Sequence, residues 1–342
     1  MEWYGQRAQL QDGRENPFAA LRILPDETCV SDRPFHAPRL RTILLGGSGL
    51  LGAALREAWS AQPDIELLPL SRAELNLTQP DRLAETLDSI PFDLLLNAAA
   101  YTRVDDAETT GGRELAMTVN GTAAGVLASC AARQRARMIH FSTDYVFDGS
   151  SPAPYREDDP PSPVSAYGRS KLAGEELVLA ASPRHLVIRL SWLCGPGRPA
   201  FPEWLLSQAM TRPEVRVVSD KWACPTWAPD LAERLLGLVR MPAETAGILH
   251  FCHGPACSWL DWGQQILDTA AAAGRPLQTT RLTPVSIADL PGMAARRPAC
   301  STLATERWEA ITGTAPPPWT RWLAAMAGLP APLSSTDAAV PG

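Results

Sequence analysis

The chain has 342 residues, of which 45% are hydrophobic and 20% are charged, a composition typical of globular proteins that bury a core. Lys and Arg number 31 against 37 Asp and Glu, which gives a formal net charge of −6. Binding a nucleic-acid duplex requires a basic surface, so this balance argues against nucleic acid as a partner. A small anionic ligand stays compatible with the composition, because a local site can be positive on an acidic protein.

Seven scattered cysteines predict reduced thiols, because a chain of this length does not need disulfides to be stable. The apolar segment 115–132 is interrupted by Thr118, Asn120 and Thr122, so we expect no membrane span there. The first residues include Glu2 and Arg7 and contain no apolar signal core. These features predict a cytoplasmic protein that does not engage a membrane.

Residues 1–39 mix charge, proline and glycine without periodicity, and we expect them to form a disordered extension. Beyond them, short apolar runs alternate with helical patterns. The apolar runs fall at 42–45, 65–70, 93–99, 137–143 and 186–192. One helical pattern follows the first run and ends at 59, and two others cover 115–132 and 167–181. Strands that alternate with helices predict parallel βαβ units. The expected fold class is therefore α/β, with a Rossmann-type doubly wound parallel sheet.

The composition changes at Trp192, because nine of the eleven tryptophans lie at or after this position. We predict an NAD(P)-binding domain over 40–192 and a smaller C-terminal α/β substrate-binding domain over 193–226 and 247–325. The helical pattern within 227–246 is expected to return to the first domain. The segment 326–342 is rich in Ala, Pro and Ser and is expected to be a flexible tail.

Three glycines follow the first predicted strand, Gly46, Gly49 and Gly52, in a GxxGxxG spacing. Glycine permits a tight turn and lets the backbone approach a pyrophosphate, which then rests on a helix N-terminus, here at Leu50 and Leu51. Glycines in such a turn can also serve packing alone. Their place at the start of a βαβ series favours dinucleotide binding.

The residues after the second strand bear on the choice of cofactor. NAD-binding proteins usually carry an acidic residue there, which holds the ribose hydroxyls. This chain has Ser71 and Arg72 instead. An arginine can bind a 2′-phosphate, so NADPH is favoured. NADH stays open, because Arg72 can also be a solvated loop residue.

Tyr167 and Lys171 form a YxxxK pattern, whose spacing places both side chains on one face of a helix. The ammonium of Lys171 is expected to lower the pKa of Tyr167 from about 10, so that the phenol can protonate a ketone as hydride arrives. Thr143 ends an earlier strand, where parallel sheets bind ligands, and its hydroxyl can hold the same carbonyl. Asn120 lies between these elements and is expected to contact the cofactor.

A cluster of metal-binding residue types lies at His250, Cys252, His253 and Cys257. Structural zinc sites usually use two separated ligand pairs that close a loop. Alternate residues of the strand-like run at 247–251 face opposite sides, so we expect no metal site there.

Taken together, these motifs resemble the extended short-chain dehydrogenase/reductases and, within them, the dTDP-4-dehydrorhamnose reductase family. The resemblance covers about residues 41–325. It rests on the segments NAAAYT (97–102), STDYVFDG (142–149), YGRSKLAGE (167–175), RLSW (189–192), CPT (224–226), CSW (257–259) and RPACS (297–301).

The resemblance implies a reaction in which NADPH reduces the C4 keto group of dTDP-4-dehydro-6-deoxy-L-mannose, giving dTDP-L-rhamnose. The family's Thr–Tyr–Lys set falls on Thr143, Tyr167 and Lys171. Its cofactor contacts fall on the glycine turn and on Asn76, Leu77, Ala100, Tyr101 and Thr102, and its nucleotide-sugar contacts fall on Asp144, Trp192 and Thr226. Arg297 can meet the substrate diphosphate or be solvated.

Two departures from the family pattern bear on specificity. Asn76 stands where Asp is usual, although its amide can still hydrogen-bond adenine, and Cys300 stands where Asn is common. Some family members use magnesium at a dimer interface. Matching carboxylates cannot be located in this sequence, so magnesium and a homodimer are left open.

Three other functions compete with this reading. A dehydratase is disfavoured, because Tyr145 stands where dehydratases of this clan carry Glu after Thr-Asp. A reductase of another nucleotide 4-keto-deoxysugar stays open. So does a non-catalytic NADP-binding regulatory subunit similar to the beta subunit of methionine adenosyltransferase.

Overall fold

The computed structural model describes residues 39–241, 245–290 and 292–329. The extension predicted at 1–38 and the tail at 330–342 lie outside the described residues. The predicted tail is wrong at its beginning, because α10 (Leu323–Met326) packs in the fold and Met326 is buried. The Met326 sulfur accepts a hydrogen bond from the indole of Trp262 at 3.4 Å.

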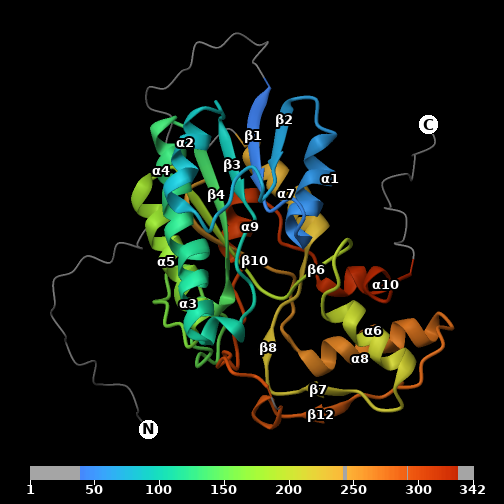
Figure 1. Ribbon diagram of the computed structural model, residues 1–342. Helices are drawn as coiled ribbons and strands as arrows, with labels where there is room; N and C mark the ends of the chain where they lie inside the picture. Colours follow the sequence, from blue (N-terminus) through green and yellow to red (C-terminus); the bar gives the residue numbers. More distant parts are fainter. Residues whose placement is uncertain (1–38, 242–244, 291, 330–342) are drawn as a thin grey trace, which may run out of the picture.

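A six-stranded parallel sheet forms the centre of the molecule, with the order β10-β5-β4-β3-β1-β2 (Figure 1). Its strands are β1 (Leu40–Leu45), β2 (Ile65–Leu70), β3 (Leu94–Asn97), β4 (Arg137–Thr143), β5 (Leu186–Leu190) and β10 (Gly247–Phe251). Most of them are continuous buried runs, as expected for a parallel sheet covered on both faces. The strand order reverses between β1 and β3, which is where doubly wound sheets bind ligands. The predicted fold class is confirmed.

Helices cover both faces of this sheet (Figure 1). One face carries α2 (Pro80–Asp88), α3 (Thr110–Ala116), η2 (Met117–Thr122), α4 (Ala123–Arg133) and α5 (Ala166–Ala181), and the other carries α1 (Leu50–Ser60), α7 (Ala228–Val239) and α9 (Glu306–Thr312). Helix α7 packs against α1, where the buried indole of Trp59 donates to the Ala232 carbonyl at 3.0 Å. The predicted domain boundary at residue 247 is wrong, because β10 pairs in parallel with β5 inside the central sheet.

The stretch Thr110–Arg133 is one continuous helix, and the mean hydropathy of its most apolar 18-residue window is 1.4, which by length and composition is enough to cross a membrane. It covers the sheet instead, and 56% of its most apolar window is buried inside the fold. Helices that pack in a protein core have the same composition, so packing accounts for its apolar character.

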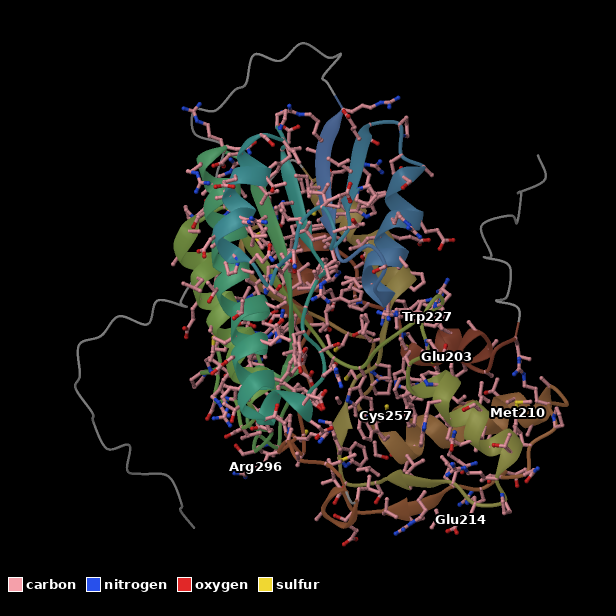
Figure 2. The ribbon with its side chains drawn as sticks, in the orientation of Figure 1. Glu203, Met210, Glu214, Trp227, Cys257 and Arg296 are labelled. Carbon is pink, nitrogen blue, oxygen red and sulfur yellow. The ribbon has the colours of Figure 1, made fainter. Side chains whose placement is uncertain are left out.

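A smaller lobe lies below the sheet in Figure 1 and is held together by short sheets and helices around Trp262 and Trp319. Trp227 lies where the chain passes towards this lobe, while Met210 and Glu214 lie at its outer end (Figure 2). Its elements are β6 (Leu193–Cys194), α6 (Phe201–Thr211), β7 (Arg216–Val218), β8 (Trp222–Ala223), β9 (Thr226–Trp227), β11 (Cys257–Ser258), α8 (Trp259–Ala272), β12 (Thr283–Val285), η4 (Ile287–Asp289) and η5 (Trp319–Trp322).

Candidate active site

The glycine turn between β1 and α1 requires glycine at two positions. Gly46 has φ +78°, and a Cβ there would lie 2.6 Å from the Ala98 backbone. A Cβ on Gly52 would lie 2.0 Å from the Gly46 carbonyl oxygen. Gly49 caps α1 without any side-chain hydrogen bond, so the first backbone N–H groups of α1, including those of Leu50 and Leu51, can bind an anion.

A cavity of about 470 Å³ opens beside this turn, at the point where the strand order reverses. It brings together six residues predicted to contact the cofactor, namely Gly46, Arg72, Asn76, Leu77, Ala100 and Tyr101. Its wall combines apolar side chains with backbone of the turn, as expected for a dinucleotide site. Asn76 Oδ1 accepts from the Thr78 backbone N–H at 3.1 Å, so the Nδ2 end of the amide has to serve any contact with adenine.

Asn120, predicted to contact the cofactor, is hydrogen-bonded within the protein. It is buried in the π-helical turn η2, where Oδ1 accepts from Tyr101 N at 2.8 Å. Nδ2 donates to Tyr101 O at 3.0 Å and to Ser170 Oγ at 2.9 Å. These bonds use every donor of the amide, so Asn120 fixes Tyr101 against α5. Thr102 follows on the exposed side of the same loop.

Thr143 and Tyr167 meet at the carboxyl end of β4. Ser165 caps the start of α5 by accepting from Gly168 N at 3.1 Å, which places Tyr167 in the first helical turn. Burial raises the pKa of Tyr167 to about 12, although a hydrogen bond with the Thr143 hydroxyl opposes this shift. The predicted lowering of this pKa by Lys171 is therefore not found. A phenol in this environment keeps its proton at neutral pH and can donate it.

Lys171 is buried one helical turn after Tyr167. Its Nζ donates to the Phe141 carbonyl at 2.7 Å and lies 3.2 Å from His140 Nε2. Burial lowers the pKa of Lys171 to about 8, while the charge of Glu175 opposes this shift. The amine is thus anchored to the backbone of β4, which explains why Lys171 does not act on the pKa of Tyr167 here.

Asp144, predicted to bind the substrate, is held by contacts within the protein. The side chain is buried and accepts hydrogen bonds from Thr143 Oγ1, at 3.0 Å, and from the Ser301 hydroxyl. Burial raises the pKa of Asp144, and the charge of Lys221 opposes that shift. Asp144 therefore orients the Thr143 hydroxyl.

Lys221 is a fully buried cation near this carboxylate, and no sequence pattern pointed to it. Its Nζ donates to the Pro298 carbonyl at 2.9 Å and lies 4.9 Å from the centre of the Tyr145 ring. Burial lowers its pKa to about 8, and the charge of Asp144 opposes this shift. The Tyr145 ring in turn meets the Tyr167 ring edge-on, with 5.7 Å between centroids. Lys221 thus supports the catalytic tyrosine through Tyr145.

The two other predicted substrate contacts, Arg297 and Thr226, are engaged inside the protein. Arg297 makes a two-pronged ion pair with Asp105, at 3.0 and 2.6 Å, so its charge is already neutralised. Thr226 is fully buried, and its hydroxyl donates to the Ser191 carbonyl at 2.6 Å. Both residues hold distant loops together, which a linear motif does not reveal.

Trp192, the predicted sugar-site tryptophan, adopts a strained backbone with φ +40°. Its ring stacks on Trp262 with 5.5 Å between centroids and lies 5.7 Å from the Trp259 ring. Within the described part of the chain, its buried indole N–H has no hydrogen-bond partner. A buried donor without a partner is costly, so this N–H is suited to a ligand oxygen.

The residues at 250–257 point in different directions. His253 Nδ1 accepts from Trp227 N at 3.1 Å, while its Nε2 lies 3.0 Å from Asp230. Cys252 donates to the Leu303 carbonyl. Over 39–241, 245–290 and 292–329, no three His, Cys, Asp or Glu side chains form a group that could hold a metal.

Comparison with known proteins points to the same family as the sequence motifs. The family model described as the RmlD substrate binding domain matches residues 40–329. The chain belongs to this family. The resemblance inferred from the sequence motifs is thereby confirmed.

Curated relatives in this family are similar over nearly their whole length. A dTDP-4-dehydrorhamnose reductase of Burkholderia thailandensis is 35% identical over 289 residues, covering 82% of this chain and 95% of the relative. One from Escherichia coli is 32% identical over 285 residues, covering 82% and 94%. A crystal structure of the Bacillus anthracis dTDP-4-dehydrorhamnose reductase in complex with NADP has a TM-score of 0.77 and 29% identity, covering 84% of this chain and 98% of that one.

Arg56 of α1 lines the cavity together with Arg72, and no sequence pattern predicted this. Among the described residues of the cavity wall, none is acidic. The helical spacing could have predicted the position of Arg56, because Arg56 follows Gly52 by one helical turn and so faces the same side of α1.

Proposed function

We propose that the protein is a dTDP-4-dehydrorhamnose reductase, which uses NADPH to reduce the C4 keto group of dTDP-4-dehydro-6-deoxy-L-mannose to dTDP-L-rhamnose. The observation that carries the proposal is that Thr143, the last residue of β4, and Tyr167, in the first turn of α5, come together at the ligand-binding edge of the sheet. The names of relatives above 30% identity support the choice of substrate. The glycine turn and the adjoining cavity fit the pyrophosphate and adenosine of the cofactor.

A bound nicotinamide would supply the hydride, and the side chains of this protein would supply the proton. Tyr167 donates its phenolic proton to the ketone oxygen, which the raised pKa keeps available at neutral pH. Asp144 takes the single hydroxyl proton of Thr143, so the Thr143 oxygen can accept from the Tyr167 hydroxyl and hold the phenol in place before proton transfer. We propose that the Trp192 indole N–H, which lacks a partner in the described part of the protein, binds an oxygen of the sugar nucleotide.

The test is NADPH oxidation by the purified chain with dTDP-4-dehydrorhamnose, followed at the nicotinamide absorbance and by identification of the sugar product. We expect oxidation that depends on the keto sugar and yields dTDP-L-rhamnose. Tight NADPH binding without oxidation would instead favour the regulatory-subunit function.

A second candidate substrate is another dTDP-linked 4-keto sugar. A Streptomyces antibioticus relative named a probable dTDP-4,6-dihydroxy-2-methyloxan-3-one 4-ketoreductase is 35% identical over 283 residues, covering 81% of this chain and 90% of the relative. A panel of dTDP 4-keto sugars, compared by kcat/KM, distinguishes the two substrates.

The preference for NADPH over NADH is proposed to come from Arg56 and Arg72. Arg72→Ala and Arg56→Ala are each expected to raise the Kd for NADPH about tenfold, because each removes a charge-assisted contact to the 2′-phosphate. The Kd for NADH should stay nearly constant, since NADH lacks this phosphate. Titration of cofactor fluorescence measures both constants.

Arg82→Ala serves as the control for these two variants, because Arg82 is an exposed arginine of α2 that does not line the cavity. It should leave both dissociation constants unchanged. Equal weakening of NADPH and NADH in the Arg72 or Arg56 variant would show that these arginines do not read the 2′-phosphate.

A cytoplasmic location is proposed from the thiols. The six cysteines of the described ranges are all free, and five of them are buried. Free buried thiols are usual in proteins kept in a reducing compartment.

A further inference from the structure

A chain of three buried polar side chains crosses from the sheet to the catalytic helix. Asn97 of β3, His140 of β4 and Lys171 of α5 are each only 1% exposed. Asn97 Nδ2 lies 3.0 Å from His140 Nδ1, and His140 Nε2 lies 3.2 Å from Lys171 Nζ. The proposed mechanism assigns no chemical role to any of these three residues.

The orientation of the Asn97 amide is fixed by the backbone. Its Oδ1 accepts a hydrogen bond from Ala99 N at 3.3 Å, so its Nδ2 has to face His140. Reversing the amide would place its N–H groups against the Ala99 N–H. Because Nδ2 is a donor, His140 Nδ1 has to be the acceptor.

This assignment fixes the proton on the other ring nitrogen. The His140 ring is buried, and burial lowers its pKa well below the usual value, so the ring is neutral. A neutral imidazole carries one N–H, which therefore lies on Nε2 and points at Lys171. An ammonium has no lone pair to accept this N–H, whereas an uncharged amine has one.

We propose that His140 is a positioning residue that donates from Nε2 to the Lys171 amine, favours its uncharged form and so sets the pH at which this lysine gains its charge. The proposal rests on the proposed function and takes Lys171 to contact the bound NADPH. The uncharged amine donates one N–H to Phe141 and keeps a second for that purpose. The carboxylate of Glu175, paired with Arg189 of β5, acts on Lys171 in the opposite direction.

The first test is the pH dependence of NADPH binding, measured between pH 6 and 10 without any sugar substrate. The wild-type Kd should show an inflection near the pKa of Lys171, and Lys171→Met should lack it. His140→Leu removes the donor, so the inflection should move upward by about one pH unit. His140→Gln can accept from Asn97 and donate to Lys171, and should restore the wild-type position. An unchanged inflection in His140→Leu would overturn the proposal.

The second test needs no substitution and decides the matter if His140→Leu does not fold. The nitrogen chemical shifts of ¹⁵N-histidine in the wild-type protein distinguish the two neutral forms of His140. We expect Nε2–H, and finding Nδ1–H would refute the proposal, because no donor would then face Lys171. This measurement requires neither cofactor nor turnover, so its outcome is independent of whether the reductase function holds.

Discussion

Tyr167→Phe is expected to lower kcat/KM for the keto sugar by about 10²- to 10⁴-fold, the usual contribution of a positioned general acid. The substitution removes only the hydroxyl that meets Thr143. The Kd for NADPH should change little, because the cavity that accommodates the adenosine end is lined by other residues. Steady-state NADPH oxidation and cofactor titration on the same preparation measure both quantities.

Tyr155→Phe is the matched control for this prediction. The Tyr155 hydroxyl donates to Asp148 at 2.7 Å, away from Thr143, and its ring stacks on Phe147. Loss of that bond should cost about 1 kcal/mol of stability and leave kcat/KM nearly unchanged. If Tyr167→Phe retained full turnover, the proton donor would have to be another group.

Glu175→Leu is expected to lower the free energy of unfolding by about 3–5 kcal/mol, the largest effect on stability that we predict. Glu175 and Arg189 form an ion pair in which the side chains are 0% and 1% exposed, with a shortest distance of 2.7 Å. Removing the carboxylate leaves a guanidinium buried without its counter-charge, which is costly in a low-dielectric interior. Urea unfolding followed by circular dichroism gives the difference.

Two further variants test whether the unpaired charge is the cause. The double variant Glu175→Leu with Arg189→Met should recover most of the lost stability, since it removes both charges. Asp88→Ala breaks the exposed pair with Arg133 and should cost less than about 1 kcal/mol. An equal loss in Glu175→Leu and in the double variant would point to packing as the cause.

The sequence was sufficient to predict those features of the fold and the site that depend on residues close together along the chain. The GxxGxxG turn follows from the spacing of Gly46, Gly49 and Gly52, and the backbone clashes at Gly46 and Gly52 explain why only glycine fits there. The YxxxK spacing places Tyr167 and Lys171 on one face of α5. The alternation of strands and helices was sufficient for the fold class.

The contacts that could not be predicted from the sequence join residues that lie far apart along the chain. Arg297 pairs with Asp105, 192 residues earlier, and Ser301 reaches Asp144 across 157 residues. Asn120 was expected to contact the cofactor, but its amide is used by Tyr101 and Ser170. A sequence motif shows which polar residue is present, but it does not show whether the hydrogen bonds of that residue go to a ligand or to the protein.

The sequence by itself determined the α/β class and the glycine turn. It also identified Thr143, Tyr167 and Lys171 as a set, because local geometry and short spacings along the chain govern these features. The tertiary structure alone decided which groups lose contact with water. Burial raises the pKa of Tyr167 and lowers those of Lys171 and Lys221, since a charge is disfavoured where solvent is excluded. It also places His140 behind Lys171, a contact that arises only when β4 and α5 come together.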